Sequence, residues 1–185
     1  MSAEVATVGP APLDARGQQQ MVAMRDGVRL ATDVYLPEGP GPFPAVLVRL
    51  PYDKNGRYCW MPFLASHFIA RGYAFLPQDV RGKFRSEGEA VAFVNEAPDG
   101  YDALDWIVRQ PWSNGDVGMW GDSYYGFTQW AAAAGGHPAL KAIVPRVTIA
   151  DIDGWLEGVT PLYGAHYLAE YWTDHATNEW TVDCG

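Results

Sequence analysis

The 185 residues suit one domain, and a content of 48% hydrophobic and 19% charged residues is typical of a globular protein. The formal charge is −9, and the Lys and Arg residues are scattered rather than clustered. This excludes a nucleic-acid-binding role, because a phosphate backbone demands a basic surface.

The predicted elements alternate between strands and helices after an opening hairpin. A hairpin turn is indicated at Asp26-Gly27, between two short apolar runs. The predicted strands are 21–24, 28–36, 45–50, 73–77, 117–120 and 142–147, and the predicted helices are 60–71, 98–109 and 123–135. This order predicts an α/β fold, with a mostly parallel sheet and helices on both faces.

Three loops are expected to meet at one edge of that sheet. Pro51, Asp79 and Gly121 each follow the end of a predicted strand. In sheets of this kind the active site gathers where the carboxyl ends of the strands lie.

The strongest local signal is the turn Gly121-Asp122-Ser123-Tyr124-Tyr125-Gly126, between an apolar strand and an Ala-rich helix. A strand-to-helix turn exposes a serine hydroxyl as a nucleophile. It also places the next backbone N–H where it can stabilise an oxyanion. The two glycines are expected to relieve crowding, at Gly121 against the incoming strand and at Gly126 against the helix's neighbours. Alternatively Ser123 is only the N-cap of the helix, which leaves both glycines unexplained.

The chain resembles the N-terminal portion of one hydrolase family over about residues 21–150. That family groups cocaine esterase, X-Pro dipeptidyl-peptidase and α-amino acid ester hydrolase (CocE/NonD). Four segments carry the resemblance, including a second glycine displaced by one place in the serine turn: 24–30 (MRDGVRL), 49–54 (RLPYDK), 78–88 (QDVRGKFRSEG) and 117–126 (VGMWGDSYYG).

The resemblance implies an α/β-hydrolase fold that needs no metal and no organic cofactor. It implies that Ser123 is the nucleophile and that Tyr52 supplies an oxyanion-hole hydroxyl. The backbone N–H of Tyr124 is the implied second donor. We expect Asp79 and Arg81 to brace the loops through an ion pair. Asp122 is expected to be a solvated turn residue.

A general base is not evident among the four histidines. His67 precedes the nucleophile within a helix, and His137 lies in a Gly-Gly-His-Pro turn that we expect at the surface. His166 and His175 lie in the Trp-rich tail. The resemblance places the acid and the histidine of the triad beyond residue 185, so the fold is expected to be incomplete at its C-terminal end. We therefore expect the isolated chain to be inactive.

These expectations divide the chain into a loose leader (1–20), the first part of a catalytic domain (21–150) and the start of a helical cap (151–185). An unpaired last strand would make self-association possible. Cys59 and Cys184 are predicted to be free thiols. The sequence lacks both a signal-peptide pattern and an apolar run of roughly 18 residues, so we expect a cytoplasmic protein without membrane contact.

The leading functional hypothesis is a serine hydrolase acting on a small-molecule carboxylic ester or amide. A neutral acyl group is favoured, because Asp151, Asp153 and Glu157 do not match the acidic cluster of the family's amino-acid-specific members. Two alternatives stay open. One is an X-Pro or amino-terminal dipeptidyl-peptidase, and the other is a catalytically inactive hydrolase-like binding domain.

Overall fold

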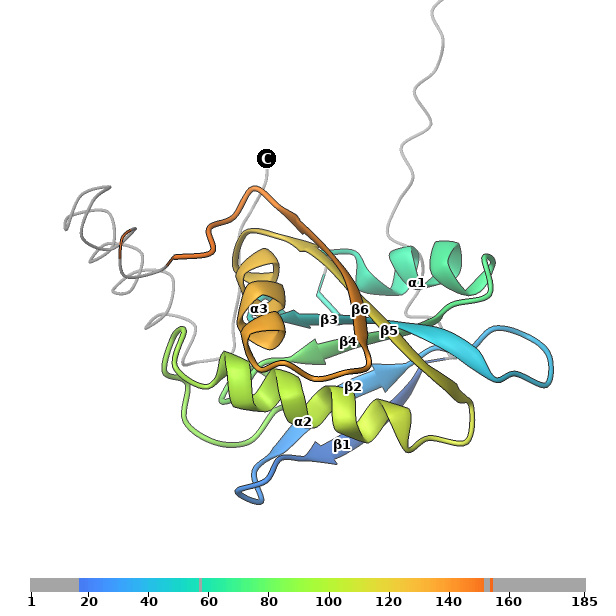
Figure 1. The fold of residues 1–185 in the computed structure, drawn as a ribbon, viewed down its shortest axis with the longest axis horizontal. Helices are drawn as coiled ribbons and strands as arrows, with labels where there is room; N and C mark the ends of the chain where they lie inside the picture. The colour runs from blue at the N-terminus through green and yellow to red at the C-terminus, as the bar shows by residue number, and fades with distance from the viewer. Residues whose placement is uncertain (1–16, 57, 152–153, 155–185) are drawn as a thin grey trace, which may run out of the picture.

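The protein is described here by a computed structural model that covers residues 17–56, 58–151 and 154. A six-stranded sheet forms its centre, in the order β1-β2-β4-β3-β5-β6 (Figure 1). The strands are β1 (Gln18–Ala23), β2 (Arg29–Val34), β3 (Phe43–Leu50), β4 (Ala74–Asp79), β5 (Ser113–Asp122) and β6 (Leu140–Arg146). The helices are α1 (Met61–Ile69), α2 (Glu96–Val108) and α3 (Ser123–Ala134).

Strand directions follow from the connections. β1 and β2 form an antiparallel hairpin, and β2 also runs antiparallel to β4. The strands β4, β3, β5 and β6 are mutually parallel, and helices connect them in the chain. The predicted mostly parallel sheet is therefore confirmed, and so is the order of its elements.

Helices cover both faces of the sheet, as predicted, because successive side chains of a strand point to opposite sides. Ala45 and Leu47 of β3 pack with residues of α2 and α3 on one face. Val46 and Val48 pack with residues of α1 on the other. Figure 1 shows α2 and α3 side by side in front of the sheet.

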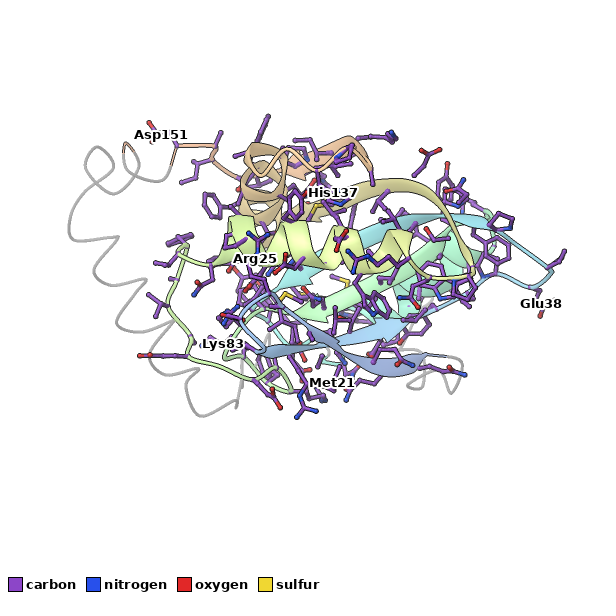
Figure 2. The ribbon with its side chains drawn as sticks, turned by 60° about the horizontal axis from the view of Figure 1, so that its bottom comes forward. Met21, Arg25, Glu38, Lys83, His137 and Asp151 are labelled. Atoms are coloured by element: carbon purple, nitrogen blue, oxygen red, sulfur yellow. The ribbon has the colours of Figure 1, made fainter. Side chains whose placement is uncertain are left out.

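The carboxyl ends of β3, β4 and β5 lie at one edge, where the sequence predicts the site. Leu50 pairs with Asp79 in the parallel register, and the N–H of Val80 donates to the carbonyl of Leu50 at 3.1 Å. Lys83, in the loop after β4, lies toward the same end of the sheet as Arg25 at the hairpin tip (Figure 2). The loops and the hairpin therefore share this end of the molecule.

The prediction that His137 lies at the surface is wrong. The side chain is 6% exposed, and its ring packs edge-on against Tyr101 of α2. Its Nδ1 accepts a hydrogen bond from the N–H of Ala139 at 3.1 Å. Gly136, at φ +70°, turns the chain so that the ring returns to α2 instead of entering solvent.

None of the helices in the described ranges has the length and apolarity needed to cross a bilayer. The segment expected to begin a cap, with His166, His175 and Cys184, lies almost entirely outside the described residues, and so does most of the expected leader.

Candidate active site

Ser123 lies at the junction between β5 and α3, in a strained backbone conformation. Its φ is +50°, a left-handed value that non-glycine residues adopt mainly where the surroundings impose it. The residue is solvent-exposed, whereas its neighbours Gly121 and Tyr124 are buried. The N-cap position belongs to Asp122, which makes no side-chain capping bond. N-capping therefore does not explain the serine, and the turn presents its hydroxyl outward.

The two glycines of the turn are required by close contacts. A Cβ on Gly121 would lie 2.0 Å from the ring of Tyr125, so the crowding comes from this tyrosine and not from the incoming strand as expected. Gly121 also has φ +148°. A Cβ on Gly126 would lie 2.7 Å from the side chain of Thr148, which confirms close packing of α3 against a neighbouring segment.

Tyr52 brings its hydroxyl to the serine from the loop after β3. Its oxygen lies 3.5 Å from Ser123 Oγ, although 71 residues separate the two positions. The ring is 7% exposed and meets Tyr58 and Tyr125 edge-on, with ring centroids 5.6 and 6.0 Å away. Such contacts orient an aromatic ring, so the phenol is held beside the turn that carries Ser123.

A buried set of polar side chains, which we call the helix-side network, fastens the other side of the turn. It consists of Arg49, Gln78, Glu96, Tyr124 and Thr128, each at most 4% exposed. The Tyr124 hydroxyl donates to Glu96 Oε1 at 2.8 Å and accepts from the N–H of Phe93 at 2.9 Å. The side chain of the residue after Ser123 is thus anchored in the core.

Arg49 links that anchor to the sheet. Its Nε donates to Gln78 Oε1 at 2.8 Å, and its Nη1 donates to the carbonyl of Glu96 at 2.8 Å. The Thr128 hydroxyl of α3 donates to the carbonyl of Arg49 at 3.1 Å. Burial raises the pKa of Glu96, and the positive charge of Arg49 opposes that rise.

A second set of charged residues, the loop-side network, holds the loop that carries Tyr52. It consists of Asp33, Asp53, Lys54, Asp79 and Arg85. Lys54 Nζ lies 2.7 Å from Asp33 Oδ1, and Arg85 Nη1 lies 2.6 Å from Asp53 Oδ1. The backbone N–H of Lys54 donates to Asp79 Oδ1 at 2.9 Å. The network therefore joins β2, β4 and two loops around Tyr52.

Asp79 and Arg81 both brace loops, but not through the single ion pair we expected. Asp79 contacts the Lys54 N–H and lies 3.6 Å from Arg85 Nη1. Arg81 pairs with Asp99 of α2 at 2.6 Å and with Asp26 of the hairpin at 2.7 Å. Each residue at this strand end thus finds its partner on a different element.

Asp122 is only partly the solvated turn residue that we expected. It is half-buried, and its Oδ1 lies 3.4 Å from Arg146 Nε in β6, without making a hydrogen bond. Cys59 is a free thiol, as predicted, and it is buried beside Tyr125. Burial raises the pKa of this thiol to about 12, so it is protonated at neutral pH.

Sequence reasoning named Tyr52, Ser123 and Tyr124, and Asp79 as a loop brace, but missed the other residues that hold them. Arg49 gave a usable signal, because a cation within a strand predicted to be buried on both faces needs a buried partner. Asp33, in β2 with Leu30, Ala31 and Val34, gave a similar one. Glu96 gave none, since an acidic residue in the first turn of a helix is ordinary.

A general base for Ser123 is not evident in the described part of the chain. His67 packs against the ring of Phe63 in α1, and His137 against Tyr101. Neither histidine makes a described contact with the Ser123 hydroxyl. Among the described residues, His, Cys, Asp and Glu side chains also form no group of three that could hold a metal ion.

Comparison with known proteins gives this geometry a family. The family model for X-Pro dipeptidyl-peptidase (S15 family) matches residues 26–182. The chain belongs to this family. The S15 match includes the hairpin turn, both loops and the serine turn, and so agrees with the resemblance seen in the sequence motifs.

Relatives of this S15 chain are named as hydrolases. It is 50% identical to cocaine esterase of Rhodococcus sp. over 134 residues. The aligned region covers 71% of this chain and 23% of the esterase. The structure of an α-amino acid ester hydrolase is 37% identical with a TM-score of 0.66, over 85% of this chain and 30% of that one. The chain thus spans about a quarter of the length of the curated relatives it matches.

A third comparison supports the fold. A CocE/NonD family hydrolase from Staphylococcus aureus superimposes with a TM-score of 0.69 at 24% identity, over 89% of this chain and 34% of that one. The predicted α/β-hydrolase fold is confirmed by these matches together with the mixed sheet and its covering helices.

Proposed function

We propose that Ser123 is the nucleophile of a serine hydrolase that cleaves carboxylic esters or amides through an acyl-enzyme. One observation carries the proposal. An exposed serine at φ +50° on a strand-to-helix turn lies with its Oγ 3.5 Å from the hydroxyl of a buried tyrosine. A donor beside a nucleophile can stabilise the charge that develops when a carbonyl is attacked.

In this mechanism Ser123 Oγ attacks the carbonyl carbon while a base removes the hydroxyl proton. The carbonyl oxygen becomes an oxyanion, which accepts hydrogen bonds from the Tyr52 hydroxyl and the Tyr124 N–H. The intermediate collapses, the leaving alcohol or amine takes the proton from the base, and the acyl group stays on Ser123. Water then releases the acid by the same steps. We assign the base and its orienting acid to residues outside the described ranges.

Labelling with a fluorophosphonate tests the nucleophile in the complete gene product. We expect stoichiometric labelling and an acyl burst with an activated ester, and both should disappear in Ser123→Ala. Ser66→Ala is the matched control, because Ser66 is an exposed serine of α1 whose hydroxyl donates to its own helix. A complete gene product that resists the reagent would favour the inactive binding domain instead.

The substrate class is the second part of the proposal. We favour a neutral acyl ester or amide, and the 50% identity to a cocaine esterase supports this choice. The alternative is cleavage after an amino-terminal X-Pro dipeptide, which the S15 family match favours. Comparing kcat/KM for a benzoyl ester and an aminoacyl-proline anilide separates the two. A large preference for the anilide would overturn our choice.

We also propose that residues 1–185 alone are inactive, because the family resemblance places the acid and the histidine of the triad beyond residue 185, and His67 and His137 pack elsewhere. The isolated chain should give no burst with an activated ester. A stoichiometric burst that Ser123→Ala removes would overturn this expectation and place the base within the chain.

A further inference from the structure

We propose that Asp79 is a positioning residue for the oxyanion hole, because its carboxylate fixes the loop that carries Tyr52. This inference rests on the proposed function, in which the Tyr52 hydroxyl stabilises the oxyanion. Asp79 does not touch the substrate in this proposal. It acts through the backbone of the loop.

Two hydrogen bonds bracket Tyr52 at equal distances along the chain. Two residues before it, the carbonyl of Leu50 accepts from the N–H of Val80 at 3.1 Å. Two residues after it, the N–H of Lys54 donates to Asp79 Oδ1 at 2.9 Å. The loop is thus held on both sides of Tyr52 by consecutive residues at the end of β4.

The loop forms a tight turn directly after Tyr52. Asp53 lies between Tyr52 and Lys54 at φ +60°, its carbonyl accepts from the N–H of Gly56, and its carboxylate accepts from the N–H of Asn55. These local bonds fix the shape of the turn but not its place relative to the sheet. The bond from the Lys54 N–H to Asp79 ties the turn to β4, together with the Lys54–Asp33 and Arg85–Asp53 ion pairs.

Asp79 is itself held from the other side. The Ser86 hydroxyl donates to the carbonyl of Asp79 at 2.6 Å and accepts from the N–H of Ala31 at 2.8 Å. The carboxylate of Glu87, the residue after Ser86, accepts hydrogen bonds from the backbone N–H and the Nε of Arg29 in β2. A continuous path of contacts therefore leads from the hairpin through the second loop to Asp79 and the turn of Tyr52.

The surroundings of Asp79 favour a positioning role over a stabilising one. Its side chain is fully buried, and Oδ2 makes no hydrogen bond to any described residue. Arg85 lies 3.6 Å from that oxygen, and the Lys54 ammonium pairs with Asp33 instead. A buried carboxylate with one unsatisfied oxygen is unfavourable for folding, so its benefit has to lie elsewhere.

A double-mutant cycle with Tyr52 tests this inference in the complete gene product. Asp79→Ala, Tyr52→Phe and the double variant are compared by kcat for an activated ester, with rates divided by the concentration of fluorophosphonate-titrated sites. We expect Asp79→Ala to lower kcat by about tenfold to a hundredfold, the range for a misplaced catalytic group. In the Tyr52→Phe background the same change should have less than about a twofold effect, because the group being positioned is gone.

Asp102→Ala is the matched control. Asp102 also accepts a backbone N–H, from Arg25 at 2.7 Å, but it does so on α2 beside the hairpin tip. This variant should leave kcat unchanged. If Asp79→Ala does not fold, Asp79→Asn replaces it. Asparagine keeps an acceptor but removes the charge, so its loss of kcat should be smaller and should depend on Tyr52 in the same way.

Two results would overturn the inference. One is an unchanged kcat in both Asp79 variants. The other is an equal loss with and without the Tyr52 hydroxyl, which is the behaviour of a residue that only stabilises the fold. A normal kcat in Tyr52→Phe, or an undiminished burst in Ser123→Ala, would instead contradict the proposed function itself.

Discussion

The two proposed oxyanion donors are held in opposite ways. Tyr124 offers a backbone N–H, and the helix-side network holds this residue by its side chain, whose hydroxyl lies 2.8 Å from Glu96. Tyr52 offers a side-chain hydroxyl, and the loop-side network holds its loop by the backbone N–H of Lys54, 2.9 Å from Asp79. In each case the described anchoring bond is made by a different group from the proposed donor.

The two networks also differ in what they join. The helix-side network connects β3, β4, α2 and α3 within the core, where Arg49 is completely buried. The loop-side network reaches the surface, where Arg85 is 40% and Asp53 24% exposed. Breaking the first should therefore reduce stability, whereas breaking the second should mainly reduce the precision of the site.

The largest expected loss of stability follows from replacing Arg49. Arg49→Met leaves the buried carboxylate of Glu96 without its cation, whereas the nearby Asp99 keeps its ion pair with Arg81. The free energy of unfolding should fall by about 3–5 kcal/mol, as for other buried ion pairs that lose one partner. Urea denaturation of the complete gene product, followed by tryptophan fluorescence, measures this loss.

Arg25→Met is the control for that experiment, because Arg25 pairs with Asp102 at the surface and is 58% exposed. Its effect on the free energy of unfolding should be much smaller, because solvent screens an exposed ion pair. Equal losses in the two variants would remove the distinction between a buried network and a surface pair.

Two glycine substitutions are expected to distinguish a loss of stability from a loss of reactivity at Ser123. A Cβ on Gly82 would lie 2.2 Å from the backbone nitrogen of Ala90, whereas a Cβ on Gly121 would meet the ring of Tyr125. Both positions have positive φ, so alanine costs about 1–3 kcal/mol in backbone strain alone. Because backbone cannot move aside as a ring can, Gly82→Ala should lose more stability.

Gly121→Ala should lose more of its fluorophosphonate labelling per folded molecule, because Tyr125 lies beside both Tyr52 and the serine turn. Thermal unfolding and labelling of the same samples measure the two effects. If one variant lost more stability and also more labelling per folded molecule, the two substitutions would not distinguish an effect on the fold from an effect on the site.

The sequence predicted the fold well, because the fold depends on local patterns. An apolar run such as Ala45–Leu50 indicates a strand buried on both faces, and the glycines around Ser123 indicate a sharp turn. The supporting networks were not predictable, because their partners are far apart in the chain: Arg49 meets Glu96, and Lys54 meets Asp33. Local spacing does not encode such pairs. His137 was misplaced for a related reason, since its turn is polar and glycine-rich but folds back onto α2.

A smaller effect is expected from the phenol that anchors Tyr124. Tyr124→Phe keeps the ring but removes the hydroxyl, so Glu96 Oε1 and the Phe93 N–H lose this hydrogen-bond partner. The cost should be about 1–3 kcal/mol in the free energy of unfolding. Labelling of Ser123 should persist at moderate urea concentrations below the new midpoint. A loss of labelling without a loss of stability would mean that the phenol acts at the site rather than in the core.

The last expected effect is a change of slope with pH, and it concerns the loop-side network. Burial raises the pKa of Asp79 from 3.8 to about 6, and the Lys54 N–H, the Lys54 charge and Arg85 oppose the rise while Asp53 adds to it. Between about pH 4 and pH 6 the folded protein therefore binds this proton more tightly than the unfolded chain does. The contribution of Asp79 to stability is greatest below that range, and it decreases as the pH rises to 6.

Asp79→Asn removes this titration and leaves the other titratable groups of the network in place. The variant should therefore gain stability relative to the parent as the pH rises from 4 to 7. Urea midpoints of both proteins at unit pH steps measure the difference. If that difference were constant across the range, Asp79 would titrate as an ordinary exposed carboxylate. Burial would then not make the Asp79 carboxylate unfavourable for folding. Only the geometry of the loop would then distinguish the loop-side network from the helix-side network.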